Sequence, residues 1–216
     1  MASATRLVVF DWDGTLMDST GQIVRAATGA ISQLGLPERG PEAIRDIIGL
    51  GLRESWQRLF PELGPEDFSP FVEAYRDHFL SPELQTARLF DRAAEVVEEL
   101  ARRGLVLAVA TGKSRLGLDR ELAATGLARF MAGSRTADET RSKPHPDMLL
   151  ELMSGLAAGP DETLMVGDTE WDLEMARRAG VSAVAVSYGA HAPERLKAYA
   201  PRACIDAIDA LLTVLA

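Results

Sequence analysis

Two aspartates stand one residue apart in the stretch LVVFDWDGTLMDS. Asp11 and Asp13 come directly after the apolar run of residues 7–10, and a glycine and a threonine follow them. A buried parallel strand that ends in acids presents its carboxylates at the carboxyl edge of the sheet, where open α/β sheets bind their ligands. The pair therefore predicts a site of polar chemistry at the end of the first strand.

Two further apolar runs also end in polar residues. Thr111 and Gly112 follow one of them, and Asp168 follows the other within the stretch VGDT. The carboxyl ends of parallel strands face one crevice, especially where the strand order reverses. We therefore expect these residues to converge on Asp11 and Asp13, so that the site contains acids from two strands.

Clustered carboxylates without a cysteine or a histidine pair suit Mg²⁺, a hard cation that prefers oxygen ligands and retains several waters. Beside such a metal, Asp11 can stay ionised and attack a phosphorus atom, which gives an aspartyl-phosphate. In this interpretation Asp13 lies near like charge. We therefore expect it to hold a proton more tightly, to protonate the leaving alcohol and later to take a proton from water.

Phosphoryl transfer also needs hydrogen-bond donors and positive charge around the phosphate oxygens. Thr111 offers a hydroxyl, Gly112 offers a backbone N–H, and Lys143 offers a compact positive charge. Pro144 biases the preceding lysine toward an extended conformation, which can direct its ammonium inward. The chain uses only three lysines, so Lys143 is a strong candidate for a site residue.

Short apolar runs alternate with helical patterns along most of the chain. The runs typical of buried parallel strands are residues 7–10, 105–110, 163–166 and 181–186. Helical patterns lie between them, the clearest at residues 91–103. This alternation predicts an α/β fold with a doubly wound parallel sheet of the Rossmann-like type.

One region breaks the alternation. From about residue 16 to residue 86 the sequence shows amphipathic helical segments only, at 21–34, 42–48, 52–59 and 66–80, divided by turns rich in glycine and proline. We interpret this region as a helical cap inserted after the first strand. The expected domains are an α/β core of residues 1–15 and 87–216 and a helical cap of residues 16–86.

The motifs DWDGT, ATGKS, SKPHP and VGDTEWD occur in this order between Asp11 and Asp172. They resemble the four ordered motifs of the haloacid dehalogenase (HAD) superfamily of phosphotransferases, and the helical insert stands where that superfamily carries its first type of cap. The stretches FDWDGTLMDS and KPHPDML most resemble the phosphoglycolate phosphatase-like hydrolases. The resemblance implies a Mg²⁺-dependent phosphatase that hydrolyses a small phosphate monoester.

The resemblance also implies a role for each acid. Asp11 would be the nucleophile and a metal ligand. Asp13 would be the acid and base, with its backbone carbonyl on the metal. Asp168 would bind Mg²⁺, and Asp172 would be a supporting acid near the metal.

Further roles concern the phosphate and the substrate. Thr111 and Gly112 would hold the phosphate, and Lys143 would neutralise both the nucleophile and the phosphate. Residues 49–53 stand where family caps carry a substrate-specificity loop, with Arg53 as the candidate substrate-binding residue, and a plain helix-to-helix turn is the alternative. Lys113 is left open between a site role and a solvent-facing position. Asp18 and Ser19 are expected to help start the next helix, with a direct substrate contact as the alternative.

Other reactions of the superfamily fit less well. A dehalogenase does not need the second acid, so Asp13 argues against it, and a phosphonatase needs a cap lysine, which residues 16–86 lack. A sugar phosphomutase keeps both aspartates and remains an alternative, although family mutases tend to place a basic residue where this chain reads TGQI. A non-catalytic regulatory relative is the other alternative, but such relatives usually lose a motif residue and none is missing here.

The amino-acid composition limits the partners and the cellular compartment that we expect for this protein. With 23 Lys and Arg against 32 Asp and Glu, the net charge of −9 argues against nucleic acid and against an anionic membrane surface. The single cysteine excludes an internal disulfide, and no stretch approaches the ~20 apolar residues that span a bilayer. We expect a cytoplasmic protein, a monomer or weak homodimer, whose partner is a small-molecule phosphate ester.

Overall fold

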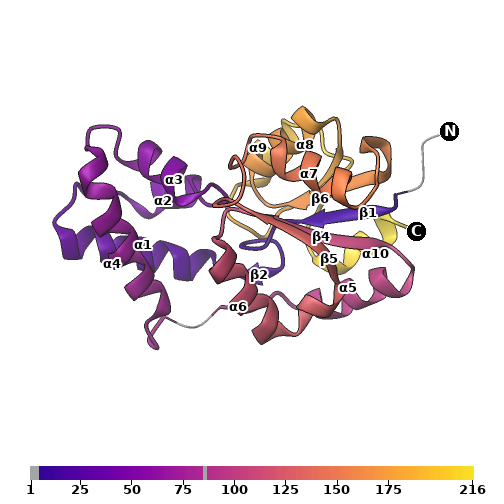
Figure 1. Cartoon of the computed structure of the whole chain (residues 1–216), viewed down its shortest axis with the longest axis horizontal. Coiled ribbons are helices and arrows are strands. Elements are labelled where there is room, and N and C mark those ends of the chain that lie inside the picture. Colours follow the sequence, from indigo (N-terminus) through magenta and orange to yellow (C-terminus); the bar gives the residue numbers. More distant parts are fainter. Residues whose placement is uncertain (1–4, 85–86) are drawn as a thin grey trace.

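The structure, a computed structural model, describes residues 5–84 and 87–216. Two bodies lie next to each other in it: a sheet covered by helices on both faces, and a group of helices at one end (Figure 1). The helices of this smaller group are α1 (Thr20–Leu34), α2 (Pro41–Asp46), α3 (Leu52–Leu59), the short 3-10 helix η1 (Pro65–Asp67) and α4 (Phe68–Leu80).

The larger body is built on a six-stranded sheet with the order β5-β4-β1-β6-β7-β8. Every neighbouring pair of strands is parallel. The chain first adds β4 and β5 on one side of β1 and then β6, β7 and β8 on the other, so the strand order reverses at β1. The strands are β1 (Leu7–Phe10), β4 (Val106–Thr111), β5 (Met131–Thr136), β6 (Thr163–Gly167), β7 (Ser182–Val186) and β8 (Ala203–Ile205).

Helices form a layer on each face of the sheet (Figure 1). One layer consists of α5 (Ala93–Arg102), α6 (Arg115–Thr125) and α10 (Leu211–Val214). The other consists of α7 (Asp147–Gly155), α8 (Glu170–Ala179) and α9 (Pro193–Lys197). Short 3-10 helices connect these elements: η2 (Leu127–Phe130), η3 (Pro160–Glu162) and η4 (Ile208–Ala210).

Strand β1 lies at the centre of the core. Val8 and Phe10 pack in the apolar cluster that contains residues of α5 and α6, and Leu7 and Val9 pack in the cluster that contains residues of α7 and α8. Because successive side chains of a strand point to opposite faces, a strand covered on both faces is apolar at every position. Pairing on both sides aligns the ends of β1, β4 and β6, so the residues that follow them meet at one edge.

The fold class predicted from the sequence is confirmed. Strands β1, β4, β6 and β7 lie within one residue of the predicted runs, and the helical segments expected of the insert appear as α1 to α4. Strand β5 is absent from the prediction. Its sequence MAGSRT carries no apolar run, because it is an edge strand and most of its residues are partly exposed.

The smaller body has an apolar core of its own. The rings of Phe60 and Phe71 lie with their centroids 4.7 and 5.2 Å from that of Trp56. By contrast, Leu16 and Met17 pack into the core beside the sheet. The α/β core of residues 1–15 and 87–216 and the cap of residues 16–86 stay a prediction; residues 1–4 and 85–86 lie outside the described residues.

A second, two-stranded sheet forms where the chain passes between the larger and the smaller body. The antiparallel strands β2 (Met17–Asp18) and β3 (Arg88–Leu89) pair there, whereas the sequence predicted helices alone from about residue 16 to 86. Each strand is two residues long, too short to produce a visible pattern of alternation.

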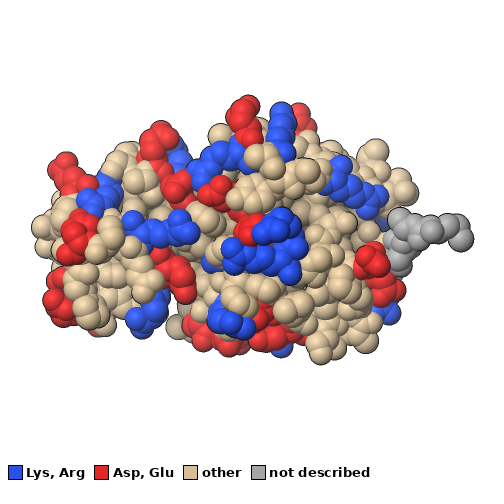
Figure 2. All heavy atoms as spheres, turned by 90° about the horizontal axis from the view of Figure 1, so that it is seen from above, with Lys and Arg blue, Asp and Glu red and all other residues tan. Residues whose placement is uncertain are grey.

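In the part of the chain that the structure describes, no helix is both long and apolar enough to cross a membrane. Acidic and basic side chains are interspersed over the face shown in Figure 2.

Candidate active site

Asp11 and Asp13 lie in the turn that follows β1. Gly14, the next residue, has a φ of +85°, in the region that side chains rarely adopt. A Cβ at this position would lie 2.2 Å from Oδ2 of Asp168. Glycine therefore lets the turn after β1 close against the end of β6.

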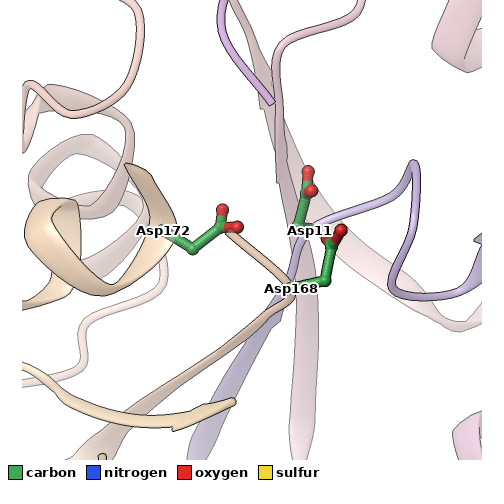
Figure 3. Close-up of side chains that lie close together, drawn as sticks. All are labelled: Asp11, Asp168 and Asp172. Atoms are coloured by element: carbon green, nitrogen blue, oxygen red, sulfur yellow. The ribbon is translucent and has the colours of Figure 1, made fainter. Parts of the chain in front are cut away.

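Three carboxylates meet at this edge of the sheet. Asp11 follows β1, Asp168 follows β6, and Asp172 lies in the first turn of α8. One oxygen of each lies within 4.8 Å of the others, and all three residues are at most 1% exposed. Figure 3 shows the carboxylates of Asp11 and Asp168 next to each other and that of Asp172 directed toward them from its helix.

Hydrogen bonds fix the orientation of two of these acids. Asp168 accepts from the Thr15 hydroxyl at 2.8 Å and from the Ala190 N–H at 2.7 Å. Asp172 accepts from the hydroxyl and the N–H of Thr169 at 2.6 and 3.0 Å. The acids are thus held in place by groups from several segments.

Lys143 is the cation of the cluster. Its Nζ lies 2.6 Å from Oδ1 of Asp11 and 2.7 Å from Oδ1 of Asp172, and its side chain is fully buried. Lys143 was predicted as a site residue from its charge, the proline that follows it and its place in the SKPHP motif, and the structure brings it directly to the predicted nucleophile.

The cluster carries excess negative charge away from water. Burial raises the pKa of Asp11 well above its usual range, against the effect of Lys143. Burial and repulsion from Asp172 raise the pKa of Asp168 to about 7. Burial alone would lower the pKa of Lys143, but Asp11 and Asp172 outweigh it and raise that pKa. The site therefore favours uptake of further positive charge.

A divalent cation fits this donor set. The acidic cluster offers hard oxygen ligands and includes no cysteine or histidine, and Oδ2 of Asp11 has no hydrogen-bond partner among the described residues. Such a set suits Mg²⁺. Of the predicted metal ligands, the structure brings the carboxylates of Asp11 and Asp168 together, and it adds Asp172, to which the sequence assigned only a supporting role.

The carboxylate of Asp13 lies outside this cluster. Its Oδ1 is 2.9 Å from Nζ of Lys113 and accepts a 2.6 Å hydrogen bond from the Ser19 hydroxyl. The Asp13 carboxylate is thus paired with the Lys113 ammonium, which reaches it from the turn after β4, and the like charge that it faces in this network is that of Glu121. Ser19 is the N-cap residue before α1, but its side chain makes no capping bond and supports Asp13 instead.

Lys113 is the centre of a second network. Its side chain is 10% exposed and also lies 3.1 Å from Oε1 of Glu121, whose Oε2 accepts from the indole N–H of Trp12 at 2.6 Å. Burial opposes the charged form of Lys113, but Asp13 and Glu121 raise its pKa. Lys113 thus belongs to the site. Glu121 was missed by the sequence analysis, because no motif marks a glutamate in the middle of α6.

Thr111 and Gly112 form the third side of the site, at the end of β4. Thr111 is 1% exposed. A Cβ at Gly112 would lie 2.4 Å from the carbonyl oxygen of Leu50 and 2.7 Å from that of Gly49. Gly49 and Leu50 of the loop before α3 thus lie directly against Gly112, and only glycine fits opposite them.

The structure does not bring Arg53 to the site. Its side chain is exposed, and its guanidinium carbon lies 5.0 Å from the centroid of the Phe68 ring. The buried face of α3 is formed by Ser55, Trp56 and Leu59, which leaves Arg53 on the outer face. In this arrangement Arg53 is not among the residues that line the cavity, and its contact with substrate stays a prediction.

Polar contacts hold the smaller body, called here the helical body (α1 to α4), against the larger body, called here the sheet body, beside the acids. The indole N–H of Trp171 donates to the carbonyl oxygen of Asp46 at 3.1 Å, and Arg195 pairs with the Asp46 carboxylate. The N–H of Gly51 donates to Oγ of Ser142 at 2.7 Å. A cavity of about 180 Å³ lies between the two bodies, with Asp11, Asp13, Thr111 and Gly112 in its wall.

Comparison with known proteins identifies relatives over nearly the whole chain. Residues 8–186 match the family described as haloacid dehalogenase-like hydrolase. The protein named "Probable phosphatase IndB" from Dickeya dadantii is 38% identical over 93% of this chain and 89% of its own length. The phosphoglycolate phosphatase of Vibrio parahaemolyticus is 30% identical over 98% and 96%.

A solved structure agrees with these relatives. The crystal structure of a hydrolase from Pseudomonas syringae superposes with a TM-score of 0.88, at 26% identity, over 99% of this chain and 98% of that one. The similarity therefore covers both the sheet body and the helical body.

Replacing Lys143 with methionine should strongly destabilise the protein, because the buried Asp11 and Asp172 lose the cation that pairs with both of them. We expect Lys143→Met to lower the free energy of unfolding by about 3–5 kcal/mol, measured by urea titration with a chelator present. Lys197→Met, at an exposed position of α9, is the matched control and should change it by less than about 0.5 kcal/mol. Equal effects of the two variants would contradict the electrostatic account.

Proposed function

The chain belongs to the haloacid dehalogenase-like hydrolase family, and we propose that it is a cytoplasmic, Mg²⁺-dependent phosphatase that hydrolyses a small phosphate monoester through an aspartyl-phosphate on Asp11. The observation that carries the proposal is the buried cluster of Asp11, Asp168 and Asp172 with Lys143, next to a cavity. The relatives named as phosphatases support it.

In the first step, a carboxylate oxygen of Asp11 attacks the phosphorus atom of the ester. The P–O bond to the alcohol breaks, and the leaving oxygen takes the electron pair and a proton from Asp13. Asp13 lines the same cavity as Asp11, two residues further on, which supports this division of roles. For this step Asp13 must first take up a proton from solvent and turn from the Lys113 ammonium, with which its carboxylate pairs in this structure, to the leaving oxygen.

In the second step, a water molecule attacks the phosphorus atom of the aspartyl-phosphate. Asp13, now deprotonated, accepts a proton from this water, and the P–O bond to Asp11 breaks to return the carboxylate. One group thus serves as acid and then as base. The covalent route divides one difficult displacement into two easier ones.

The remaining residues bind and neutralise the phosphate in this proposal. The Thr111 hydroxyl and the Gly112 N–H donate to its oxygens, and Lys143 offsets the charge on Asp11 and phosphate. Asp11, Asp168 and Asp172, with the backbone carbonyl of Asp13, would hold Mg²⁺, which supplies positive charge to the phosphate oxygens.

Asparagine at position 11 tests the nucleophile. Asp11→Asn keeps the volume of the side chain but cannot form the acyl phosphate, so we expect kcat on 4-nitrophenyl phosphate to fall by at least about 1,000-fold. Asp18→Asn, on the exposed residue of β2, is the matched control and should keep normal activity. Near-normal turnover by Asp11→Asn, with normal near-UV circular dichroism, would exclude Asp11 as the nucleophile.

Asparagine at position 168 separates metal binding from folding. The pKa of Asp168 is raised from 3.8 to about 7 in the folded protein, so the folded state loses stability as the pH rises through this range. Asp168→Asn removes that penalty while an amide oxygen can still accept from Ala190. At about pH 8 with a chelator, we expect a higher melting temperature than for the unsubstituted protein.

The same variant should lose the response to Mg²⁺. Adding Mg²⁺ should raise the melting temperature of the unsubstituted protein, because a cation that binds only the folded state stabilises it, and it should raise that of Asp168→Asn far less. An equal Mg²⁺-induced shift in both proteins would show that Asp168 is not a ligand.

A further inference from the structure

The cavity beside the acids has an almost entirely apolar wall on the side of the helical body. The lining residues come from α1, α3, α4 and the loop before α3. The apolar ones are Ile23, Ala27, Ile47, Ile48, Leu50, Leu52, Leu59, Phe71, Phe79 and Leu80. Ser55 and Tyr75 add two hydroxyls, and burial raises the pKa of the Tyr75 phenol further, so that it stays neutral. This wall therefore offers neutral surface to whatever is attached to the phosphate.

Each positively charged side chain in the cavity wall is either already paired with carboxylates or exposed to solvent. Lys113 lies 2.9 Å from Asp13 and 3.1 Å from Glu121, which already neutralise it. Arg76 and Arg120 are exposed to solvent, where water screens their charge. Arg53, the cation expected from the sequence, lies on Phe68 outside the cavity. Among the described lining residues, the helical body thus supplies no buried cation.

This distribution of charge affects which leaving alcohol the cavity can bind. A carboxylate or second phosphate in the leaving group would lose its water against an apolar wall without gaining a buried partner, which is costly. An apolar group would bury its surface there, which is favourable. The cavity of about 180 Å³ includes the place of the phosphate, so the group that it encloses beside the ester oxygen is at most about one aromatic ring, since an apolar cavity of about 150 Å³ holds benzene.

We propose that the natural substrate is the phosphate monoester of an uncharged, largely apolar alcohol, with a group of about the size of one aromatic ring next to the ester oxygen, rather than an anionic ester such as phosphoglycolate. The inference rests on the proposed function and narrows it. The helical body selects the substrate by excluding charge, through the apolar surface that α1, α3 and α4 share with the catalytic cavity.

A matched pair of esters tests this selection. Benzyl phosphate and 4-carboxybenzyl phosphate have similar leaving alcohols and differ by one carboxylate at the far end of the ring. We expect kcat/KM to be at least about tenfold higher for benzyl phosphate, and higher for benzyl phosphate than for phosphoglycolate. Equal values, or a preference for either carboxylate-bearing ester, would overturn the inference.

A lysine placed in the apolar wall should reduce the discrimination. Leu52 begins α3, is only partly buried and lines the cavity, so Leu52→Lys can supply the missing cation. We expect the ratio of kcat/KM for the two benzyl esters to fall by at least about tenfold. Leu150→Lys, on the exposed face of α7 at a position 45% exposed, is the matched control and should leave the ratio unchanged. An unchanged ratio in Leu52→Lys would contradict the assignment of this wall to the leaving group.

Different results would contradict the proposed phosphatase function and the proposed apolar substrate class. If no phosphate ester, including 4-nitrophenyl phosphate, is hydrolysed with Mg²⁺ present, the proposed function itself is wrong. If 4-nitrophenyl phosphate is hydrolysed and the carboxylated ester is turned over at least as well as benzyl phosphate, the phosphatase stands and only the apolar substrate class is overturned.

Discussion

Burial of three carboxylates beside a single lysine is the constraint on which the rest of this structure depends. Asp11, Asp168 and Asp172 come from two strand ends and a helix start, and Lys143 neutralises only part of their charge. Holding such a cluster away from water is costly. It persists because the sheet aligns the strand ends and because hydrogen bonds from Thr15, Ala190 and Thr169 fix the acids. The same excess charge makes the site receptive to a divalent cation.

The two aspartates that follow β1 face different surroundings although one residue separates them. Asp11 lies in the acidic cluster, whereas Asp13 is held by Lys113 and Ser19 on the side of the cavity. The two carboxylates pair with different lysines, Lys143 for Asp11 and Lys113 for Asp13. This separation matches the needs of the proposed reaction, in which one carboxylate must stay ionised beside the metal while the other exchanges protons. The apolar wall opposite them then determines which alcohols can enter.

The sequence predicted the elements that are buried on both faces and the residues that follow them. β1, β4, β6 and β7 could be located because continuous apolar runs are required there, and Asp11, Thr111 and Asp168 could be placed because parallel strands end at one edge. β5 carries no such run, as an edge strand. Glu121 lies in a helix without a motif, and the environment of Asp13 depends on the path of one lysine side chain. The position of Arg53 depends on which face of α3 packs inward, and the resemblance that suggested this residue does not give that face.

The central claim, that Asp11 is the group that takes up the phosphate, is tested most directly by trapping the acyl phosphate. Borohydride reduces an aspartyl-phosphate to homoserine, so the enzyme can be quenched with acid during turnover of 4-nitrophenyl phosphate, reduced, digested and sequenced by mass spectrometry. The account predicts homoserine in place of Asp11 alone, and only when both Mg²⁺ and substrate were present. Homoserine in place of another aspartate, or none at all while hydrolysis proceeds, would contradict it.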